Sequence, residues 1–331
     1  MMKKLLCIIL ALFILSSTAL AAEPRTFFAM DTYMSISAPS AAEELIDICV
    51  GEVTHLEGLL SATDPDSEIY AINSGSTAEI SAETAAILEF ALNMCSETGG
   101  DLDITMYPIV RAWGFTTGEY RVPDQAELDS LLENVGHDSI AIEDRHIIIP
   151  EGYMIDLGSV AKGYASDMVA ETLREGGVTS ALIDLGGNIY CIGSKADGSD
   201  WKVGLRDPLG GDYLGYVAVS NCAVVTSGCY ERYFEKDGMR YGHIFDPATG
   251  YPADNGLISV TVISESGAVC DALSTALYVM GPTGAAEYLA DNDSVEAVLV
   301  KSDGGLIITK GLEGIFVPLG GYAYSETEWI E

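Results

Sequence analysis

A strand, a turn and the start of a helix follow one another in the stretch Asp156-Leu157-Gly158-Ser159-Val160-Ala161-Lys162-Gly163-Tyr164. Apolar residues recur with helical spacing over residues 160–175, and Gly176-Gly177 ends that pattern. A helix N-terminus exposes unpaired N–H groups and the positive end of the helix dipole, which suits a phosphate group. Lys162, in the first turn, could reach an anion held there. A plain structural junction with a solvated lysine explains the stretch equally well.

The segments on either side of this stretch predict an α+β fold, built mainly from antiparallel sheets with packed helices. Helices are predicted at residues 41–60, 82–97 and 270–280, in addition to 160–175. Strands are predicted at residues 32–38, 180–184, 189–192, 201–205, 214–219, 223–226 and 257–264, with a hairpin at 140–149 and further strands within 295–317. Helices and strands do not alternate as they do in a doubly wound βαβ protein.

The overall charge of the chain is strongly negative. Its 331 residues contain 16 Lys and Arg against 50 Asp and Glu, a net charge of -34. The hydrophobic fraction of 48% is that of an ordinary globular protein, so the charge does not indicate disorder. The charge argues against nucleic acid as a partner, because its phosphates attract clustered Lys and Arg. An anionic small ligand would need a cation beside it.

The first 22 residues have the three parts of a secretory signal peptide. Lys3 and Lys4 precede an apolar run at residues 5–15, and small residues follow around Ala21. We expect residues 1–22 to be cleaved and residues 23–331 to form a single soluble domain, exported to the periplasm or another extracytoplasmic space. An uncleaved anchor is the alternative, but the apolar run is too short to span a membrane comfortably. Cys7 lies near the start of that run, far from the expected cleavage point, so the sequence does not predict a lipoprotein.

The mature chain carries three further expectations. No later apolar stretch approaches 18 residues, so no transmembrane helix is expected. Loss of Lys3 and Lys4 leaves 14 Lys and Arg against 50 Asp and Glu, a net charge of -36. Six cysteines remain, none in a CxxC or Cys/His pattern typical of zinc sites. They could be buried free thiols or could form one or two disulfides.

Asp271 and Thr275 lie four residues apart in the predicted helix 270–280 and so share one face. A carboxylate and a hydroxyl are hard oxygen ligands, which suit Mg²⁺ or Ca²⁺ rather than zinc. Taken alone, the pair has a simpler interpretation as an acidic residue at a helix start with a buried threonine.

His243 precedes a turn of sequence Asp-Pro-Ala-Thr-Gly at residues 246–250. The other histidines, His55, His137 and His146, lie away from Gly-rich polar segments. A lone histidine is usually structural or solvated. Its reference pKa nevertheless suits proton transfer near neutral pH, so His243 is the candidate general base.

Three segments in this order, 156–164, 243–252 and 271–277, resemble the ApbE-type FAD:protein FMN transferases, a family of flavin-trafficking enzymes. No G-x-G-x-x-G, P-loop, G-x-S-x-G or H-E-x-x-H motif is present. The resemblance implies a T-fold-like α+β architecture with FAD bound in a cleft between two lobes. It also implies transfer of FMN from FAD, with release of AMP, to a Thr or Ser hydroxyl of an acceptor flavoprotein such as a redox-complex subunit.

The resemblance implies roles for individual residues as well. Asp271, Thr275 and the backbone carbonyl of Ser159 match the family's ligands for Mg²⁺. His243 matches the histidine proposed to activate the acceptor hydroxyl. The positions that match those lining FAD are Met30, Asp101, Leu102, Asp103, Asp156, Lys162 and Phe245.

The chain departs from the family pattern at three positions. Asp31 stands where Gly is frequent, Thr63 where an aromatic residue is common, and Ser274 where some members carry a second carboxylate. These differences bear on the flavin contacts, on a stacking partner and on the strength of metal binding.

Two other functions are compatible with these residues. If water replaces the acceptor hydroxyl, the same site is a Mg²⁺-dependent FAD pyrophosphatase that yields FMN and AMP. A non-catalytic exported flavin-binding protein is the other, although storage would not need His243 beside a metal site. In each case the FAD pyrophosphate must enter a chain of net charge -36, so local positive charge is required.

Overall fold

The computed structural model of the chain describes residues 23–230, 232–319 and 327–330. The predicted signal peptide, residues 1–22, lies outside this part of the chain. Among the residues described, no helix is both long and apolar enough to cross a membrane.

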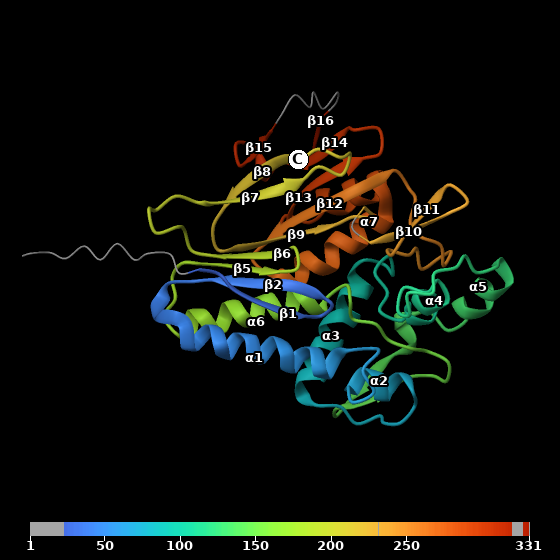
Figure 1. The fold of residues 1–331 in the computed structure, drawn as a ribbon. Helices are drawn as coiled ribbons and strands as arrows, with labels where there is room; N and C mark the ends of the chain where they lie inside the picture. Colours follow the sequence, from blue (N-terminus) through green and yellow to red (C-terminus); the bar gives the residue numbers. More distant parts are fainter. Residues whose placement is uncertain (1–22, 231, 320–326, 331) are drawn as a thin grey trace, which may run out of the picture.

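A nine-stranded sheet runs through the middle of the described part of the molecule (Figure 1). In spatial order its strands are β1 (Arg25–Ala29), β2 (Thr32–Ser37), β5 (Ala181–Leu185), β6 (Asn188–Ile192), β9 (Cys222–Ser227), β12 (Leu257–Ser264), β13 (Glu296–Lys301), β14 (Leu306–Thr309) and β16 (Thr327–Ile330). Neighbouring strands are antiparallel except for β14 with β16. The prediction of an α+β fold with mainly antiparallel sheets is confirmed.

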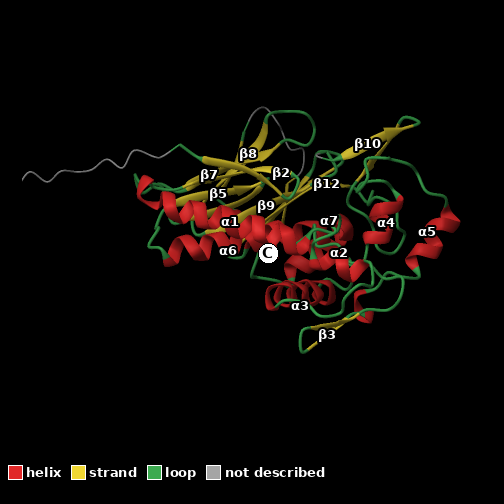
Figure 2. Cartoon of the chain, turned by 60° about the horizontal axis from the view of Figure 1, so that its bottom comes forward, coloured by secondary structure: helices red, strands yellow, loops and turns green. Residues whose placement is uncertain are grey.

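Helices cover one face of this sheet and a smaller sheet covers the other (Figures 1 and 2). These helices are α1 (Glu43–Leu60), α2 (Glu68–Asn73), α3 (Ala82–Glu97), α6 (Ala161–Glu175) and α7 (Gly267–Ala290), whereas α4 (Tyr107–Ala112) and α5 (Gln125–Leu132) lie to one side. The smaller sheet contains β7 (Trp201–Arg206), β8 (Tyr213–Val219) and β15 (Phe316–Pro318). A separate hairpin, β3 (Ala141–Glu143) with β4 (His146–Ile148), matches the one predicted at 140–149.

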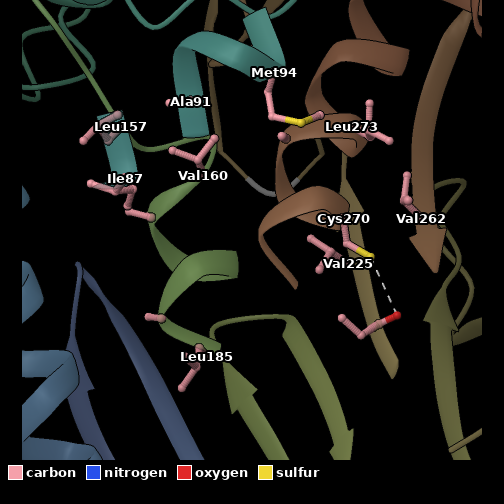
Figure 3. Close-up of a cluster of buried hydrophobic side chains, with 14 of the residues drawn as sticks. Ile87, Ala91, Met94, Leu157, Val160, Leu185, Val225, Val262, Cys270 and Leu273 are labelled. Atoms are coloured by element: carbon pink, nitrogen blue, oxygen red, sulfur yellow. Dashed lines mark hydrogen bonds between the residues drawn. The ribbon is translucent and has the colours of Figure 1, made fainter. Parts of the chain in front are cut away.

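The main hydrophobic core lies between the helices and the large sheet (Figure 3). Ile87 of α3 and Leu273 of α7 are at most 1% exposed, as is Val225 of β9. The next residue along, Val224, points to the opposite face and packs in a second core under the smaller sheet. Successive side chains of a strand point to opposite faces, so a strand buried on both sides is apolar throughout.

The helix predicted at 41–60 is present as α1, and Ile48 lies outside its buried apolar face. Ile48 is 52% exposed, whereas Cys49 and Val53 are fully buried. At 100° per residue, Ile48 points well away from the stripe formed by Cys49, Val53 and Leu56, which follows the i, i+4, i+7 spacing.

Two glycines let α6 and α7 cross at close range. A Cβ on Gly163 would overlap the carbonyl oxygen of Gly267, and a Cβ on Gly267 would overlap the hydroxyl of Ser166. The helix predicted at 270–280 therefore begins earlier, at Gly267. It breaks at Gly281, where φ is 73°, before resuming through Pro282. This crossing places the start of α6 against the side of α7.

A third hydrophobic cluster lies to one side of the helices, around α4, α5 and a hairpin that was not predicted (Figure 1). The hairpin consists of β10 (Tyr233–Lys236) and β11 (Met239–Gly242). Trp113 is the centre of this aromatic cluster, which we define as Trp113, Phe115, Phe234, Tyr241, Phe245 and Tyr251. The Trp113 indole donates to the carbonyl of Gly250 at 2.8 Å, so the cluster also holds the 246–250 turn in place.

Candidate active site

A cavity of about 770 Å³ lies between the main core and the aromatic cluster. This volume is typical of small-molecule and cofactor sites. The structure brings all eleven site residues named from the sequence to its wall: Met30, Asp101, Leu102, Asp103, Asp156, Ser159, Lys162, His243, Phe245, Asp271 and Thr275. Residues that are far apart in the sequence, from Met30 to Thr275, therefore line one cavity.

The start of α6 opens onto this cavity. The carboxylate of Asp156 accepts the N–H of Gly158 at 2.6 Å, and this contact closes the turn before the helix. The N-cap residue of α6, Val160, offers no side-chain acceptor, and the N–H of Ala161 donates to the carbonyl of Leu157 at 2.8 Å. Lys162 lies in the first turn of α6, its ammonium 3.3 Å from the carbonyl oxygen of Gly158. Burial raises the pKa of Asp156, and the Gly158 N–H and the nearby Arg232 and Lys162 partly oppose that effect.

Asp271 links α7 to the start of α6. Its Oδ2 accepts the N–H of Gly163 at 2.8 Å, and the residue is 4% exposed. The simpler interpretation placed Asp271 at the start of its own helix. The structure places it one turn inside α7, where its carboxylate lies at the positive end of α6 instead.

Small hydroxyl groups lie beside Asp271. Thr275 lines the cavity one turn further along α7, as the spacing predicted. The hydroxyl of Ser227, at the end of β9, lies 2.8 Å from that of Ser274 and 3.4 Å from that of Thr275. Ser274 is fully buried and donates to the carbonyl of Asp271 at 3.0 Å, so it supports the helix rather than facing the cavity.

The three candidate metal ligands, Asp271, Thr275 and Ser159, fit Mg²⁺ only in combination with a further ligand. Within the described chain no three His, Cys, Asp or Glu side chains gather as a metal site. Asp271, Thr275 and Ser159 offer one carboxylate, one hydroxyl and one carbonyl on the same wall. Mg²⁺ commonly binds through one or two carboxylates together with substrate phosphates and water, and this donor set fits that pattern.

His243 is held in one tautomer. Its Nδ1 lies 3.1 Å from the carbonyl oxygen of Arg232. A carbonyl can only accept, so Nδ1 carries the proton and Nε2 keeps its lone pair. Burial lowers the His243 pKa to about 4, with smaller effects from Arg232 and Lys162. The imidazole is therefore neutral near pH 7 and able to take a proton.

Asp103 has a structural function in the cavity wall. Its Oδ1 accepts the backbone N–H of Thr105 at 2.8 Å. Its Oδ2 lies 2.9 Å from the backbone nitrogen of His137 and 3.2 Å from Nδ1 of the same residue. Both carboxylate oxygens are thus engaged, and the pair orders the 101–105 loop. The neighbouring Asp101 has a raised pKa, mainly through burial and then through Asp246.

Met30 lies in a tight turn between β1 and β2. Met30 and Asp31 both have positive φ, at 48° and 58°. Glycine adopts this conformation more easily, which fits the frequent Gly of the family at the position that Asp31 occupies here. Oε1 of Glu57 accepts the N–H of Met30 at 2.8 Å and holds the turn against the cavity. Glu57 was not identified from the sequence, because its partner lies 27 residues away.

The wall near the end of α1 is polar at the position where the family commonly has an aromatic residue. Thr63 lines the cavity there, with its N–H 3.3 Å from the hydroxyl of Ser61. Aromatic surface comes instead from Tyr107, Phe115 and Phe245.

Two more residues of the wall were missed. Asn188 is 4% exposed, and its Nδ2 has no hydrogen-bond partner among the described residues. Buried donors are normally paired, so this atom is a candidate contact for a bound ligand. Arg232 also lines the cavity, and its guanidinium donates to the carbonyl of Phe115 at 2.6 Å. Its position just beyond the Thr226-Ser227-Gly228 segment, in a chain poor in cations, was the available signal.

Comparisons with known proteins agree with this site. A model of the ApbE family matches residues 30–299. The FAD:protein FMN transferase of Treponema pallidum (strain Nichols) is 33% identical over 268 residues, which cover 75% of this chain and 74% of the relative. The enzyme of the same name from Vibrio cholerae (strain O395) is 34% identical over 256 residues, covering 74% and 76%.

Solved structures agree as well. The crystal structure of the ApbE protein of Thermotoga maritima has a TM-score of 0.83 at 31% identity and covers 88% of this chain and 98% of that one. The apo form of the Pseudomonas stutzeri flavinyl transferase ApbE has a TM-score of 0.80 at 27% identity, covering 90% and 98%. On the family match and these relatives, the chain belongs to the ApbE family.

Proposed function

We propose that this protein is a Mg²⁺-dependent FAD:protein FMN transferase. It would attach FMN, through a phosphoester bond, to a Thr or Ser hydroxyl of an exported or membrane flavoprotein and release AMP. The names of its relatives support the transferase activity. The observation that carries the proposal is a neutral His243, with Nε2 unprotonated, in the same cavity as Lys162 and the start of α6.

The bond changes follow from these positions. The acceptor hydroxyl oxygen attacks the phosphorus of the FMN half of FAD, and its proton passes to Nε2 of His243. The bond between that phosphorus and the bridging oxygen breaks, and AMP leaves with the electron pair. The start of α6 and the Lys162 ammonium stabilise the negative charge on the phosphoryl oxygens. Water in place of the hydroxyl would give FMN and AMP.

Three residues of the cavity wall would hold the metal ion. We assign Oδ1 of Asp271, the hydroxyl of Thr275 and the carbonyl of Ser159 to Mg²⁺, because Oδ2 of Asp271 already accepts the Gly163 N–H. Bound Mg²⁺ would neutralise the pyrophosphate and the departing AMP. Met30, Leu102 and Phe245 would contact FAD on the walls around it.

The location and the acceptor belong to the same proposal. Residues 1–22 would direct export, and the mature single domain would act in the periplasm or another extracytoplasmic space. The acceptor would be a flavoprotein of that compartment, such as a subunit of a redox complex. The expectation of a FAD cleft between two lobes stays a prediction.

A single reaction mixture tests this function. The mature protein is incubated with FAD, Mg²⁺ and a Thr-containing acceptor peptide, and mass spectrometry and nucleotide chromatography follow the products. A peptide heavier by one FMN, with one AMP per adduct, is the expected result. AMP with free FMN and unmodified peptide would establish hydrolysis instead. A Thr→Ala peptide serves as the control, since it offers no hydroxyl.

A further inference from the structure

The cavity is acidic for a site that must hold a dinucleotide. Of its described lining residues, seven are Asp or Glu and only two, Lys162 and Arg232, are Lys or Arg. Burial raises the pKa of Asp101 and of Asp156, which shows that negative charge is already unfavourable there. A pyrophosphate would add further negative charge, so each of the two cations is important.

Arg232 is fixed at both its backbone and its side chain. Its carbonyl oxygen accepts from Nδ1 of His243 at 3.1 Å. Its Nη2 donates to the carbonyl of Phe115 at 2.6 Å, with the guanidinium carbon 5.9 Å from the centre of the Phe115 ring. A guanidinium has five N–H donors in a planar fork, so this anchor leaves others able to bind an anion.

Arg232 and Lys162 lie near the same two groups, although they come from different parts of the chain. Both lower the pKa of Asp156, and both lower that of His243. Arg232 and Lys162 also line the same cavity as Asp156 and His243. Both cations are therefore available to a phosphate that binds in this cavity.

We propose that Arg232 is a substrate-binding residue whose guanidinium binds a phosphate oxygen of FAD in the cavity that Lys162 also lines. Its carbonyl at the same time orients His243, so one residue places both the phosphate and the base. This inference rests on the proposed function, because it takes FAD as the substrate. The planar guanidinium of Arg232 can donate two hydrogen bonds to phosphate oxygens at once, whereas the ammonium of Lys162 acts as a point charge.

The test compares Arg232→Gln with a matched control, Arg240→Gln. Arg240 lies in β11, stacks over Tyr233 at 4.0 Å, pairs with Glu235 and does not line the cavity. Both variants lose one positive charge from the same region. Dissociation constants are measured by flavin fluorescence for FAD and for riboflavin, which carries no phosphate, each with and without Mg²⁺.

We expect Arg232→Gln to raise the FAD dissociation constant about tenfold or more, which is the effect of losing a charge-assisted hydrogen bond. Riboflavin binding should stay within about twofold of the wild type, and Arg240→Gln should change neither constant. Arg232→Lys should recover part of the loss. An equal weakening for FAD and riboflavin would show a merely structural effect, and unchanged FAD binding would show no contact; either result overturns the proposal.

The outcome is separable from that of the proposed function. If the wild type binds FAD but never flavinylates a peptide, the transferase fails while the Arg232 contact is still measured. If the wild type flavinylates the peptide and Arg232→Gln binds FAD normally, only the Arg232 inference fails. A wild type that binds no FAD overturns both.

Discussion

The starts of α6 and α7 lie side by side and are completed in opposite ways. At α7, the hydroxyl of Ser266 accepts from the N–H of Val269 at 3.3 Å. The carboxylate of Asp167, from α6, accepts the N–H groups of both Gly267 and Ala268. At α6, the N-cap residue Val160 supplies no side-chain acceptor, and the N–H of Ala161 donates to the carbonyl of Leu157. Asp271, from α7, takes only the N–H of Gly163.

The difference separates a structural helix start from one that is available to a ligand. Each helix supplies a carboxylate to the other, but Asp167 takes two backbone N–H groups and does not line the cavity. Asp271 takes one N–H and does line it. Ser159 and Lys162, at the start of α6, line the cavity together with His243. The start of α6 is therefore part of the candidate binding site, whereas the start of α7 is structural.

The largest expected effect is the loss of turnover in Asp271 variants. Asp271→Ala and Asp271→Asn should each lower kcat about 1000-fold or more, because a bound metal supplies several kcal/mol of charge stabilisation. Asn keeps an oxygen that can accept the Gly163 N–H, so its thermal midpoint should stay close to that of the wild type. Steady-state assays with Mg²⁺ titrations measure this. Full activity of Asp271→Asn in EDTA would eliminate the metal assignment.

His243 carries the next largest effect. His243→Gln should lower kcat about 100-fold, the lower end of what a general base contributes. Gln can donate to the Arg232 carbonyl as the imidazole does, so binding of FAD should change little. A single-turnover assay with acceptor peptide measures the rate of the chemical step separately from the binding of FAD. Turnover of His243→Gln at the wild-type rate would show that another group acts as the general base.

The same residue makes a pH prediction with a defined sign. The His243 pKa is about 4 in the folded protein against an ordinary value of 6.5. Between these values the unfolded chain binds a proton that the folded chain does not, so stability falls as the pH falls from 6.5 to 4. The slope attributable to this residue is roughly 1 kcal/mol per pH unit. NMR titration of the ring should show its midpoint near 4, and a midpoint at 6.5 would contradict the buried neutral state.

Asp167 provides the structural counterpart of Asp271. Asp167→Ala should destabilise the protein by about 2–3 kcal/mol, since it removes a charged acceptor from two N–H groups and a hydroxyl. Turnover per folded molecule should remain within about twofold of the wild type, because Asp167 does not line the cavity. Urea unfolding and active-site titration give the two numbers. An Asp167→Ala variant that keeps its stability but loses turnover would show that Asp167 serves the active site and is not only structural.

The sequence predicted the start of α6 but not the contacts that complete the start of α7. Gly158, Ser159 and Lys162 lie close together in the sequence, which shows a turn, a helix start and a lysine that the helix dipole does not favour. At α7, the Ser266 cap is a local signal that was missed, whereas Asp167 is 100 residues away from Gly267, and no local pattern records such a contact. Arg232 was missed in the same way, because its anchor is the Phe115 carbonyl, 117 residues away.

The helices and strands also were predicted where their sequence signals are local. Long periodic helices such as α1 and α3 were predicted with ends close to those observed, because their apolar stripes are local. The β10–β11 hairpin was missed, although Asp237-Gly238 is a two-residue turn signal that could have revealed it. Its strands have few buried residues and are ordered by packing on Trp113, which is distant in sequence.

The smallest expected effect concerns the β1–β2 turn, another place where the cavity wall departs from the most stable local choice. Asp31 has φ of 58° at the second turn position, and in the β10–β11 hairpin Gly238 occupies that position with φ of 77°. Asp31→Gly should stabilise the protein by about 0.5–1 kcal/mol, since relief of the left-handed conformation outweighs the added freedom of the unfolded chain. The matched change Gly238→Asp should destabilise it by a similar amount, and urea midpoints compare the two. A loss of stability in Asp31→Gly would mean that the Asp31 side chain makes a stabilising contact, and FAD binding by that variant would then show whether the contact belongs to the cavity.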